Sequence, residues 1–169
     1  MNFLIPEQIE TERLLLRRFR EHDWRDLHEL YSNPECIRYT VLTPFSEYET
    51  WQRMASLSGH WLLKKYGPYG IEEKQSEKII GFAGPYFPPA WPDPEIQWSL
   101  SQAFWGKGFA SEAVRAIKKM LSASMPDISF MSIIHPENAG SIALATKLNA
   151  HFEKEFLFKN IVWHIYRHR

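Results

Sequence analysis

Hydrophobic residues follow two spacings along this chain, and each spacing predicts a different kind of secondary structure. In two segments of the first half, apolar residues recur every three or four positions, which is typical of amphipathic helices. Asp23 opens the first segment and Asn33-Pro34 ends it. Ser46 opens the second with the form of a capping box, and Gly67-Pro68 ends it. The sequence therefore predicts two helices in this half of the chain.

The second predicted helix carries several large apolar side chains on one face. A row at helical spacing is formed by Tyr48, Trp51, Ala55 and Leu62. Because residues three or four apart lie on the same side of a helix, we expect this row to face the core. Trp24 and Trp61 also occupy helical apolar rows, so we expect them, with Trp51, to be core residues.

Short apolar runs separated by turn formers dominate the rest of the chain and predict β-strands. The expected strands are residues 11–19, 69–74, 78–84, 95–100, 128–134, 152–159 and 161–167. The proline-rich segment 85–94 should be a loop beside the sheet, because proline has no N–H to donate to a strand ladder. Two further helices are expected, one over Ser111–Ala123 and one after Asn138.

The order of these elements predicts an α/β (α+β) fold with one mixed, mostly antiparallel sheet of seven strands and about four helices. Strands 95–100 and 128–134 are joined through a helix, so they should form a right-handed βαβ crossover and lie parallel. A length of 169 residues fits one compact domain, residues 1–169.

Composition and charge exclude several classes of protein. Hydrophobic residues make up 44% and charged residues 24%, the proportions of an ordinary folded domain. With 20 Lys plus Arg against 20 Asp plus Glu, the chain lacks the excess of basic residues that nucleic acids or anionic membranes attract. No run of about 18 uncharged apolar residues is present, so we expect no membrane-spanning helix.

Cysteine and histidine usage argues against disulfide and metal chemistry. Cys36 is the single cysteine and cannot form an internal disulfide, which together with the lack of a signal-peptide pattern favours a cytoplasmic protein. His164 and His168 lie four apart, but on a strand this spacing separates them by about 13 Å. That distance is too long for one zinc ion, so we expect no metal site.

The most informative segment is the glycine-bearing loop Phe104-Trp105-Gly106-Lys107-Gly108-Phe109-Ala110-Ser111, which follows a predicted strand and opens a predicted helix. Small residues there let backbone N–H groups approach an anion at the positive end of the helix dipole, so a diphosphate would fit. A plain glycine-rich turn remains the alternative. A Walker loop is disfavoured because Gly108 follows Lys107, and a dinucleotide fingerprint because Ser111 occupies its third glycine position.

Several ordered motifs resemble those of the GNAT acetyltransferases, in particular the group related to ribosomal-protein N-terminal acetyltransferases. They are the opening ETERLLLRRF, the strands IIGFAG and EIQWSL, the loop FWGKGFASEA and the segment HPENAGSIALATKLNAHF. The resemblance implies a GNAT-like fold whose sheet splays between the two parallel strands. It also implies an N-acetyltransferase with acetyl-CoA as co-substrate, in which an amine attacks directly in a ternary complex. The acceptor would be a protein N-terminus or a small-molecule primary amine, and the enzyme a monomer or homodimer.

The resemblance also assigns the residues that would bind acetyl-CoA. The loop would hold the pyrophosphate through Trp105, Gly106, Lys107, Gly108, Phe109, Ala110 and Ser111. Trp105 stands where the family prefers Gln or Arg, but the bonds there come mainly from backbone N–H groups. The pantetheine arm would lie along the main chain of Trp98, Ser99 and Leu100, with Asn138 on its other side.

Two residues are candidates for proton transfer. Glu95 begins the strand whose later residues would hold the cofactor, so it is the first candidate for the base that deprotonates the amine. Many family members carry a tyrosine as the acid in the last helix, and this chain has Ala145 there, so Ser141 becomes the candidate acid. A structural role remains open for each: Glu95 as an exposed strand end, Ser141 as a solvated helix residue. The missing tyrosine also leaves open a non-catalytic acyl-CoA-binding module.

Aromatic residues in the predicted loops indicate where an acceptor would bind. The loops in which the family builds its acceptor pocket contain Tyr39, Phe45, Tyr86, Phe87 and Trp91. They predict an acceptor with apolar or aromatic surface, and we expect Tyr39, Phe45 and Tyr86 to contact it.

Overall fold

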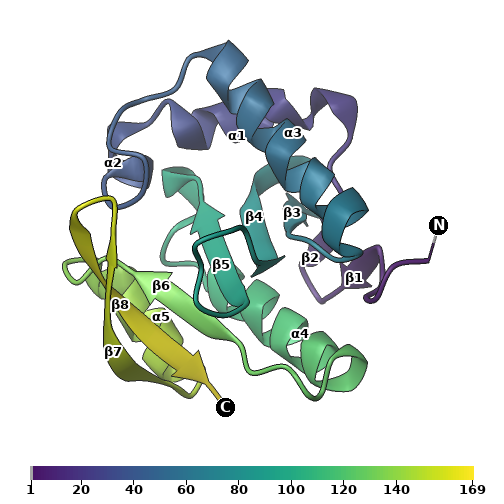
Figure 1. Cartoon of the computed structure of the whole chain (residues 1–169). Helices are drawn as coiled ribbons and strands as arrows, with labels where there is room; N and C mark the ends of the chain where they lie inside the picture. The colour runs from purple at the N-terminus through teal and green to yellow at the C-terminus, as the bar shows by residue number, and fades with distance from the viewer. Residues whose placement is uncertain (1) are drawn as a thin grey trace.

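The computed structural model describes residues 2–169, which form one eight-stranded sheet with helices on both faces (Figure 1). The strands are β1 (Gln8–Glu10), β2 (Leu14–Arg17), β3 (Tyr69–Glu73), β4 (Lys78–Tyr86), β5 (Glu95–Leu100), β6 (Met131–Ile134), β7 (Ala150–Phe158) and β8 (Ile161–His168). Their order is β1-β2-β3-β4-β5-β6-β8-β7, and the neighbours are antiparallel except for the parallel pair β5 and β6. The mixed, mostly antiparallel sheet with one parallel crossover is therefore confirmed.

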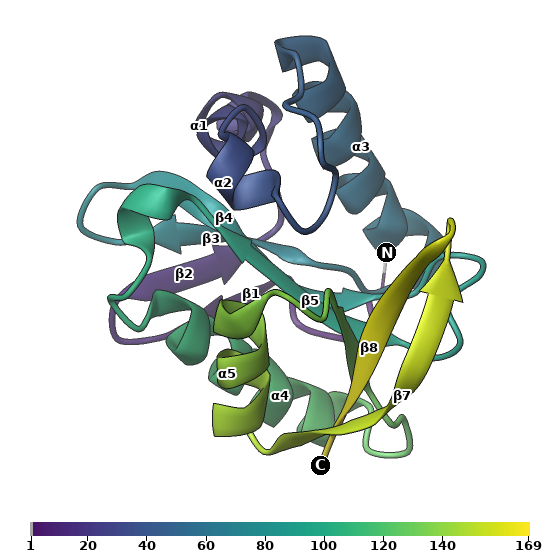
Figure 2. The ribbon, with the colours of Figure 1, turned by 90° about the vertical axis from the view of Figure 1, so that its left-hand side faces the viewer.

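The helices form two layers, one on each face of the sheet (Figure 2). One layer contains α1 (Trp24–Tyr31), α2 (Pro34–Ile37) and α3 (Glu47–Lys64), and the other contains α4 (Phe109–Ser124) and α5 (Ala139–Lys147). Short 3-10 turns at Glu21–Asp23 and Gln102–Phe104 precede α1 and α4. Within residues 2–169, no helix is long and apolar enough to cross a membrane.

Two short elements lie outside what the hydrophobic pattern shows. β1 has three residues, so the sheet has eight strands where the pattern indicates seven. α2 is a single turn that begins at Pro34 after the N-cap Asn33. Periodicity needs several repeats before it can be recognised, and elements of this length provide too few.

β4 continues two residues into the proline-rich segment, to Pro85 and Tyr86. β3 pairs with β4 only as far as Ala83, while Pro85 is paired with Ile96 of β5. Pro85 therefore lies beyond the end of β3, where the missing N–H removes no bond from that ladder. The remainder of the segment forms the loop that leads to β5.

α3 begins with the predicted capping box of Ser46 and Glu49, but it turns a different face to the core. The expected core row is exposed, with Tyr48, Trp51 and Leu62 at 68%, 47% and 49%. The buried residues of the helix are instead Thr50, Met54, Leu57, His60 and Trp61. The expectation that Trp51 is a core residue is therefore wrong, whereas that for Trp61 is confirmed.

Two polar residues explain which face of α3 is buried. The Thr50 hydroxyl lies 2.8 Å from Nδ1 of His28 on α1. His60 Nδ1 lies 2.8 Å from the Tyr66 carbonyl, and the Phe87 N–H donates to His60 Nε2 at 2.9 Å. Because each buried polar group has a partner, this face carries no penalty for unmet hydrogen bonds.

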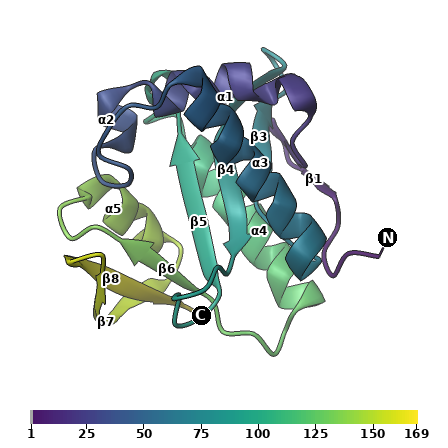
Figure 3. The same ribbon diagram turned by 45° about the horizontal axis from the view of Figure 1, so that its top comes forward.

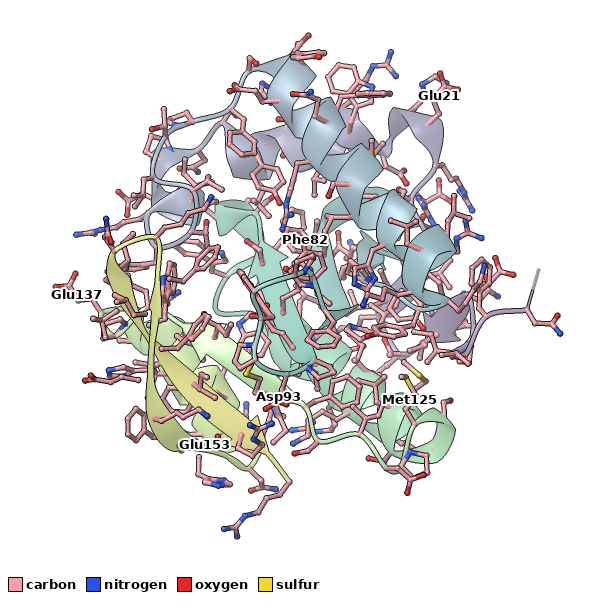
Figure 4. All side chains as sticks on the ribbon, in the orientation of Figure 1. Glu21, Phe82, Asp93, Met125, Glu137 and Glu153 are labelled. Atoms are coloured by element: carbon pink, nitrogen blue, oxygen red, sulfur yellow. The ribbon has the colours of Figure 1, made fainter. Side chains whose placement is uncertain are left out.

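A hydrophobic cluster fills each side of the sheet. Between the sheet and α4 it includes Leu16, Ile71, Ile80, Val114 and Ile117. Between the sheet and α1, α2 and α3 it includes Leu27, Leu30, Leu57, Ile79 and Phe82. Figure 4 marks Phe82 at the centre of the molecule, by β4. Since β4 contributes to both clusters, its sequence is an almost continuous apolar run.

β5 and β6 pair at one position and then separate. The parallel ladder consists of Glu95 with Met131, where the Met131 N–H donates to the Pro94 carbonyl at 3.0 Å. Beyond this point the two strands diverge (Figure 3). The Ser132 hydroxyl still reaches the Ile96 carbonyl at 2.6 Å, but no backbone ladder follows among the described residues. The expected splay between the parallel strands is therefore present.

Candidate active site

A cavity of about 450 Å³ lies beside the point where β5 and β6 separate. Its walls come from both helical layers and from the β7–β8 hairpin. The aromatic residues that line it are Tyr31, Tyr39, Phe45, Phe82, Tyr86, Trp91, Trp98, Phe156, Phe158 and Trp163. A volume of this size with mostly apolar walls is typical of a site for a small molecule.

Glu95 lines this cavity at the position where β5 and β6 pair. Its side chain accepts a hydrogen bond from Trp91 Nε1 at 2.7 Å and one from the Ile133 N–H at 3.2 Å. The residue is only 6% exposed, so an exposed strand end is excluded. Burial raises the pKa of Glu95 to about 7, although the two donors and the charge of Arg53 act in the opposite direction. A carboxyl with this pKa exchanges protons near neutral pH.

Arg53 of α3 brings a positive charge into the same cavity. Its Nε donates to Tyr31 Oη at 3.2 Å, and its Nη1 donates to Tyr86 Oη at 3.5 Å. Tyr86 is paired with Glu95 across β4 and β5, so the guanidinium and the carboxyl border one region of the cavity. Sequence patterns give no sign of this arrangement, because α3 and β5 are brought together only by the fold.

The start of α4 forms a second part of the site. Gly106 and Gly108 have φ angles of +72° and +81°, a region that favours glycine because it has no Cβ. Gly108 is the N-cap of α4, and no side chain caps the helix there. The first N–H groups of α4 therefore lack helical acceptors and are directed, with the positive end of the dipole, toward a potential anion.

Arg13 and Glu112 hold this loop in place. Arg13 Nη1 donates to the Lys107 carbonyl at 2.9 Å, and its Nε pairs with Glu112 at 2.7 Å. Glu112 also accepts from the Thr11 hydroxyl at 2.7 Å. These contacts join the first turn of α4 to the chain before β2, more than ninety positions earlier. The sequence shows only that the strand is flanked by charges, so this role for Arg13 was not predicted.

The first turn of α5 lies across the splay from β5 and contacts it. Asn138 is the N-cap of α5 and accepts from the Ser141 N–H at 3.1 Å. Trp98 Nε1 donates to the Ser141 hydroxyl at 3.2 Å. The Trp105 indole donates to the Leu100 carbonyl at 2.8 Å and so connects the loop to the end of β5. One indole N–H thus connects β5 to α5 across the splay, and another connects the end of β5 to the loop before α4.

The structure brings half of the predicted site residues together around one cavity. The cavity is lined by Tyr39, Phe45, Tyr86, Glu95, Trp98, Ser99, Asn138 and Ser141. Leu100 and the loop residues Trp105 to Ser111 lie outside the cavity lining, with Gly106, Lys107 and Gly108 exposed at the surface. Trp91 lines the cavity, whereas Phe87 packs against the core cluster on the α4 side.

Two buried donors of the cavity have no protein acceptor within residues 2–169. They are Gln97 Nε2 and Trp163 Nε1. Such N–H groups are costly to bury unless a bound molecule or water accepts a hydrogen bond from them. Neither residue was predicted, because both belong to runs that indicate only a strand.

Metal binding finds no support in the part of the chain that the structure describes. No group of three or more His, Cys, Asp or Glu side chains there is arranged to hold a metal ion. His168 is buried beside Ser132, 2.8 Å from its hydroxyl, and burial lowers the pKa of this histidine to about 3. His168 belongs to no cluster of potential metal ligands among the described residues.

Comparisons with known proteins agree with this geometry. Residues 13–151 match the family model described as an acetyltransferase (GNAT) domain. A Bacillus licheniformis protein named uncharacterized N-acetyltransferase p20 is 31% identical over 159 residues, covering 91% of this chain and 86% of the relative. An acetyltransferase from Agrobacterium tumefaciens superimposes with a TM-score of 0.85 at 24% identity, covering 100% of this chain and 97% of the other. A structure of RimL, a ribosomal L7/L12 alpha-N-protein acetyltransferase in complex with coenzyme A, gives a TM-score of 0.76 at 18% identity, with 96% of each chain covered.

Proposed function

This chain belongs to the GNAT acetyltransferase family, and from that premise we propose that it transfers acetyl from acetyl-CoA to a primary amine, with Glu95 as base and Ser141 as acid. The amine belongs to a protein N-terminus or to a small molecule. The observation that carries the proposal is the buried carboxyl of Glu95, in a cavity at the point where the parallel strands separate.

The chain has the groups that acetyl-CoA requires. The uncapped N–H groups at the start of α4 fit the pyrophosphate, and the positive φ of Gly106 and Gly108 keeps Cβ atoms away from it. The separated edges of β5 and β6 leave room for the pantetheine arm beside Trp98, Ser99 and Leu100, opposite Asn138. When bound, acetyl-CoA supplies a thioester whose carbonyl an amine can attack.

Glu95 removes a proton from the incoming ammonium group. Most amines are protonated at pH 7, so they need a base before they can attack. Because burial raises the pKa of Glu95 to about 7, roughly half of its carboxyl groups are ionised at that pH. Trp91 and Ile133 donate to its two oxygens and fix the orientation of the carboxyl.

Ser141 relays a proton to the leaving sulfur: its hydroxyl donates to the thiolate and takes up the proton that the attacking nitrogen loses as the amide forms, so the serine ends neutral. Its hydroxyl accepts from Trp98 Nε1, and within residues 2–169 its own proton is donated to no other group. The proton is therefore available to a thiolate that leaves beside α5. A thiolate is a moderately good leaving group, since a thiol ionises near pH 8.5, so a weak acid is sufficient.

The first experiment is calorimetric titration with acetyl-CoA, with ATP and NADH as controls. Selective binding in the micromolar range, about 8 kcal/mol at 1 μM, supports the cofactor site. Free thiol is then measured with a panel of amines and N-terminal peptides, for the wild type and for Ser141→Ala. Acetyl transfer that falls about 10-fold in Ser141→Ala, at unchanged acetyl-CoA affinity, supports the acid role.

Two other outcomes contradict the proposal. Acetyl-CoA binding without thiol release for any amine would identify a non-catalytic acyl-CoA-binding module. No binding at millimolar acetyl-CoA would mean that the loop before α4 is only a turn.

A further inference from the structure

Arg53 forms no direct ion pair within residues 2–169, and Glu95 is the one carboxyl that lines the same candidate acceptor cavity. The Arg53 guanidinium reaches the phenol oxygens of Tyr31 and Tyr86. Elsewhere in the chain, the buried Arg17 pairs with both Asp23 and Glu72. An arginine in an aromatic cavity without such a partner is poised to bind an anion.

The two phenols add further donors at the same place. Each phenol oxygen accepts a hydrogen bond from Arg53, and neither hydroxyl donates its proton to an acceptor among the described residues. Tyr31 is only 3% exposed, so its unused O–H lies in a region with little access to water. A guanidinium and two free O–H donors form a suitable site for a carboxylate.

The charges that line the cavity favour a ligand with one negative group. Arg53 and Lys159 are its Arg and Lys side chains, and Glu95 is its acidic one. Two cations against one carboxyl leave a positive balance, which disfavours polyamines and other acceptors with several positive charges. Glu95 opposes a dianion in the same space, so a singly charged carboxylate fits better than a phosphate dianion.

We propose that Arg53, Tyr31 and Tyr86 form a carboxylate subsite, and that the acceptor is a small primary amine that carries both a carboxylate and an aromatic or apolar body. This inference rests on the proposed acetyl transfer. It assigns Arg53 a specificity role, since the guanidinium contacts the acceptor and not the acetyl group.

The register of β4 and β5 explains how one small molecule reaches both groups. Tyr86 stands directly opposite Glu95, so their side chains project from neighbouring strands onto the same face of the sheet. An amine beside Glu95 therefore has the Tyr86 and Arg53 donors nearby for a carboxylate of the same molecule. The surrounding Phe45, Trp91 and Phe158 provide apolar contact for its body.

The test compares matched acceptors that differ only in the carboxylate. L-phenylalanine is compared with phenethylamine, and L-tryptophan with tryptamine, by thiol release from acetyl-CoA. The wild type is expected to show a kcat/KM about 10- to 100-fold higher for each amino acid than for its decarboxylated amine, as for a hydrogen-bonded charged group.

Variants of Arg53 identify the source of this preference. At pH 9, where Glu95 is ionised even without the charge of Arg53, Arg53→Met is expected to lower kcat/KM for the amino acids about 10- to 100-fold and to leave the amines within about 3-fold. Arg53→Lys keeps the charge and is expected to recover part of the loss. Arg25→Met is the control, because Arg25 is an exposed arginine on α1 outside the cavity lining. Acetyl-CoA affinity is measured for each variant to confirm that it is folded.

Three results would overturn the inference while leaving acetyl transfer intact. They are equal kcat/KM for amino acids and decarboxylated amines in the wild type, an equal loss for both in Arg53→Met, and turnover restricted to amines without a carboxylate. The absence of acetyl-CoA binding, by contrast, would overturn the proposed function itself.

Discussion

The loop before α4 presents backbone groups to a ligand, whereas the candidate acceptor cavity presents side chains. The loop is one continuous segment whose exposed glycines present backbone N–H groups. The cavity is lined by side chains from α1, α3, β4, β5, β6, β7, β8 and α5, and ten of its lining residues are aromatic. A backbone site depends on conformation and is tolerant of side-chain identity, whereas the cavity depends on each side chain. The proposed cofactor is therefore easier to infer than the acceptor.

The source of charge also differs between the two regions: it is the backbone at the loop and the side chains in the cavity. At the loop, the peptide dipoles at the start of α4 provide positive potential. In the cavity, a buried carboxyl with a pKa of about 7 faces an unpaired arginine. Variants of the cavity should therefore change how the rate depends on pH, whereas variants of the loop should change acetyl-CoA affinity equally at all pH values.

The largest effect is expected for Glu95→Gln. Removing the base should lower kcat about 10²- to 10⁴-fold, while acetyl-CoA affinity stays within about 3-fold because the loop is unchanged. In the wild type, kcat/KM should fall as the pH drops below about 7, because Glu95 takes up a proton. Steady-state rates from pH 5.5 to 9 measure both effects. A variant that keeps the wild-type rate and profile would remove Glu95 from the mechanism.

The same buried carboxyl should make folding stability depend on pH. Folding raises its pKa from 4.5 to about 7, so between these values the folded state binds more protons than the unfolded state. The free energy of unfolding therefore decreases as the pH rises from 4.5 through 7, by about 3 kcal/mol for this group. Glu95→Gln cannot titrate, so its stability relative to the wild type should rise by that amount between pH 4.5 and 8.

Urea denaturation of both proteins at several pH values measures this difference. Glutamine also replaces one acceptor with a donor that faces Trp91 or Ile133, so the change with pH, and not the absolute stability, is diagnostic. A constant difference across the range would show that Glu95 titrates alike in both states.

A smaller effect is expected for Gly108→Ala in the loop. A Cβ at φ +81° costs about 1–2 kcal/mol and would also lie 3.4 Å from Arg13 Nη2. Acetyl-CoA affinity should fall about 10-fold, equally at all pH values. Gly59→Ala is the control, because a Cβ added to Gly59 in α3 would meet no atom within 4 Å beyond its own stretch of helix. This variant should gain stability without changing affinity. An affinity unchanged in Gly108→Ala would contradict the loop as the cofactor site.

The smallest effect is expected for Trp91→Phe. Its indole donates to Glu95 and lowers the pKa of that carboxyl, so removing it should move the acid limb of kcat/KM to higher pH. The rate should fall a few-fold at pH 7 and recover by pH 9, as expected for a positioning residue. Trp51→Phe, at an exposed site on α3, should leave the profile unchanged. A uniform loss at all pH values would mean that Trp91 acts only through packing.

Sequence patterns predicted the parts of the molecule that depend on contiguous residues. The helix beginning after Ser46, the α4 helix and the strands from Tyr69 onward follow from local periodicity and caps. The parallel pair follows from the helix between its strands, since such a crossover must span the sheet. The motif resemblance then supplied the splay.

The failures have a common physical cause. α3 has two apolar rows at helical spacing, and polar contacts of Thr50 and His60 with distant residues decide which one is buried. Arg13 and Arg53 acquire their positions through contacts 94 and 22 or more positions away, so no local pattern marks them. Glu95 is identified because it begins a strand next to the splay, but its burial depends on segments that only the fold brings together. That burial raises the pKa of Glu95, against the hydrogen bonds from Trp91 and the β6 backbone, which lower it.

Because β5 and β6 pair at a single position, the hydrogen-bonded ladder of the sheet is interrupted between them. Beyond Glu95, the backbone N–H groups of β5 that point away from β4 face an edge that β6 does not cover, so these amide hydrogens should exchange rapidly with solvent. A ligand seated in the splay would protect them and would stabilise the fold by about 2.7 kcal/mol at a concentration 100 times its Kd. The stability of the C-terminal half would then increase with the concentration of acetyl-CoA around the protein.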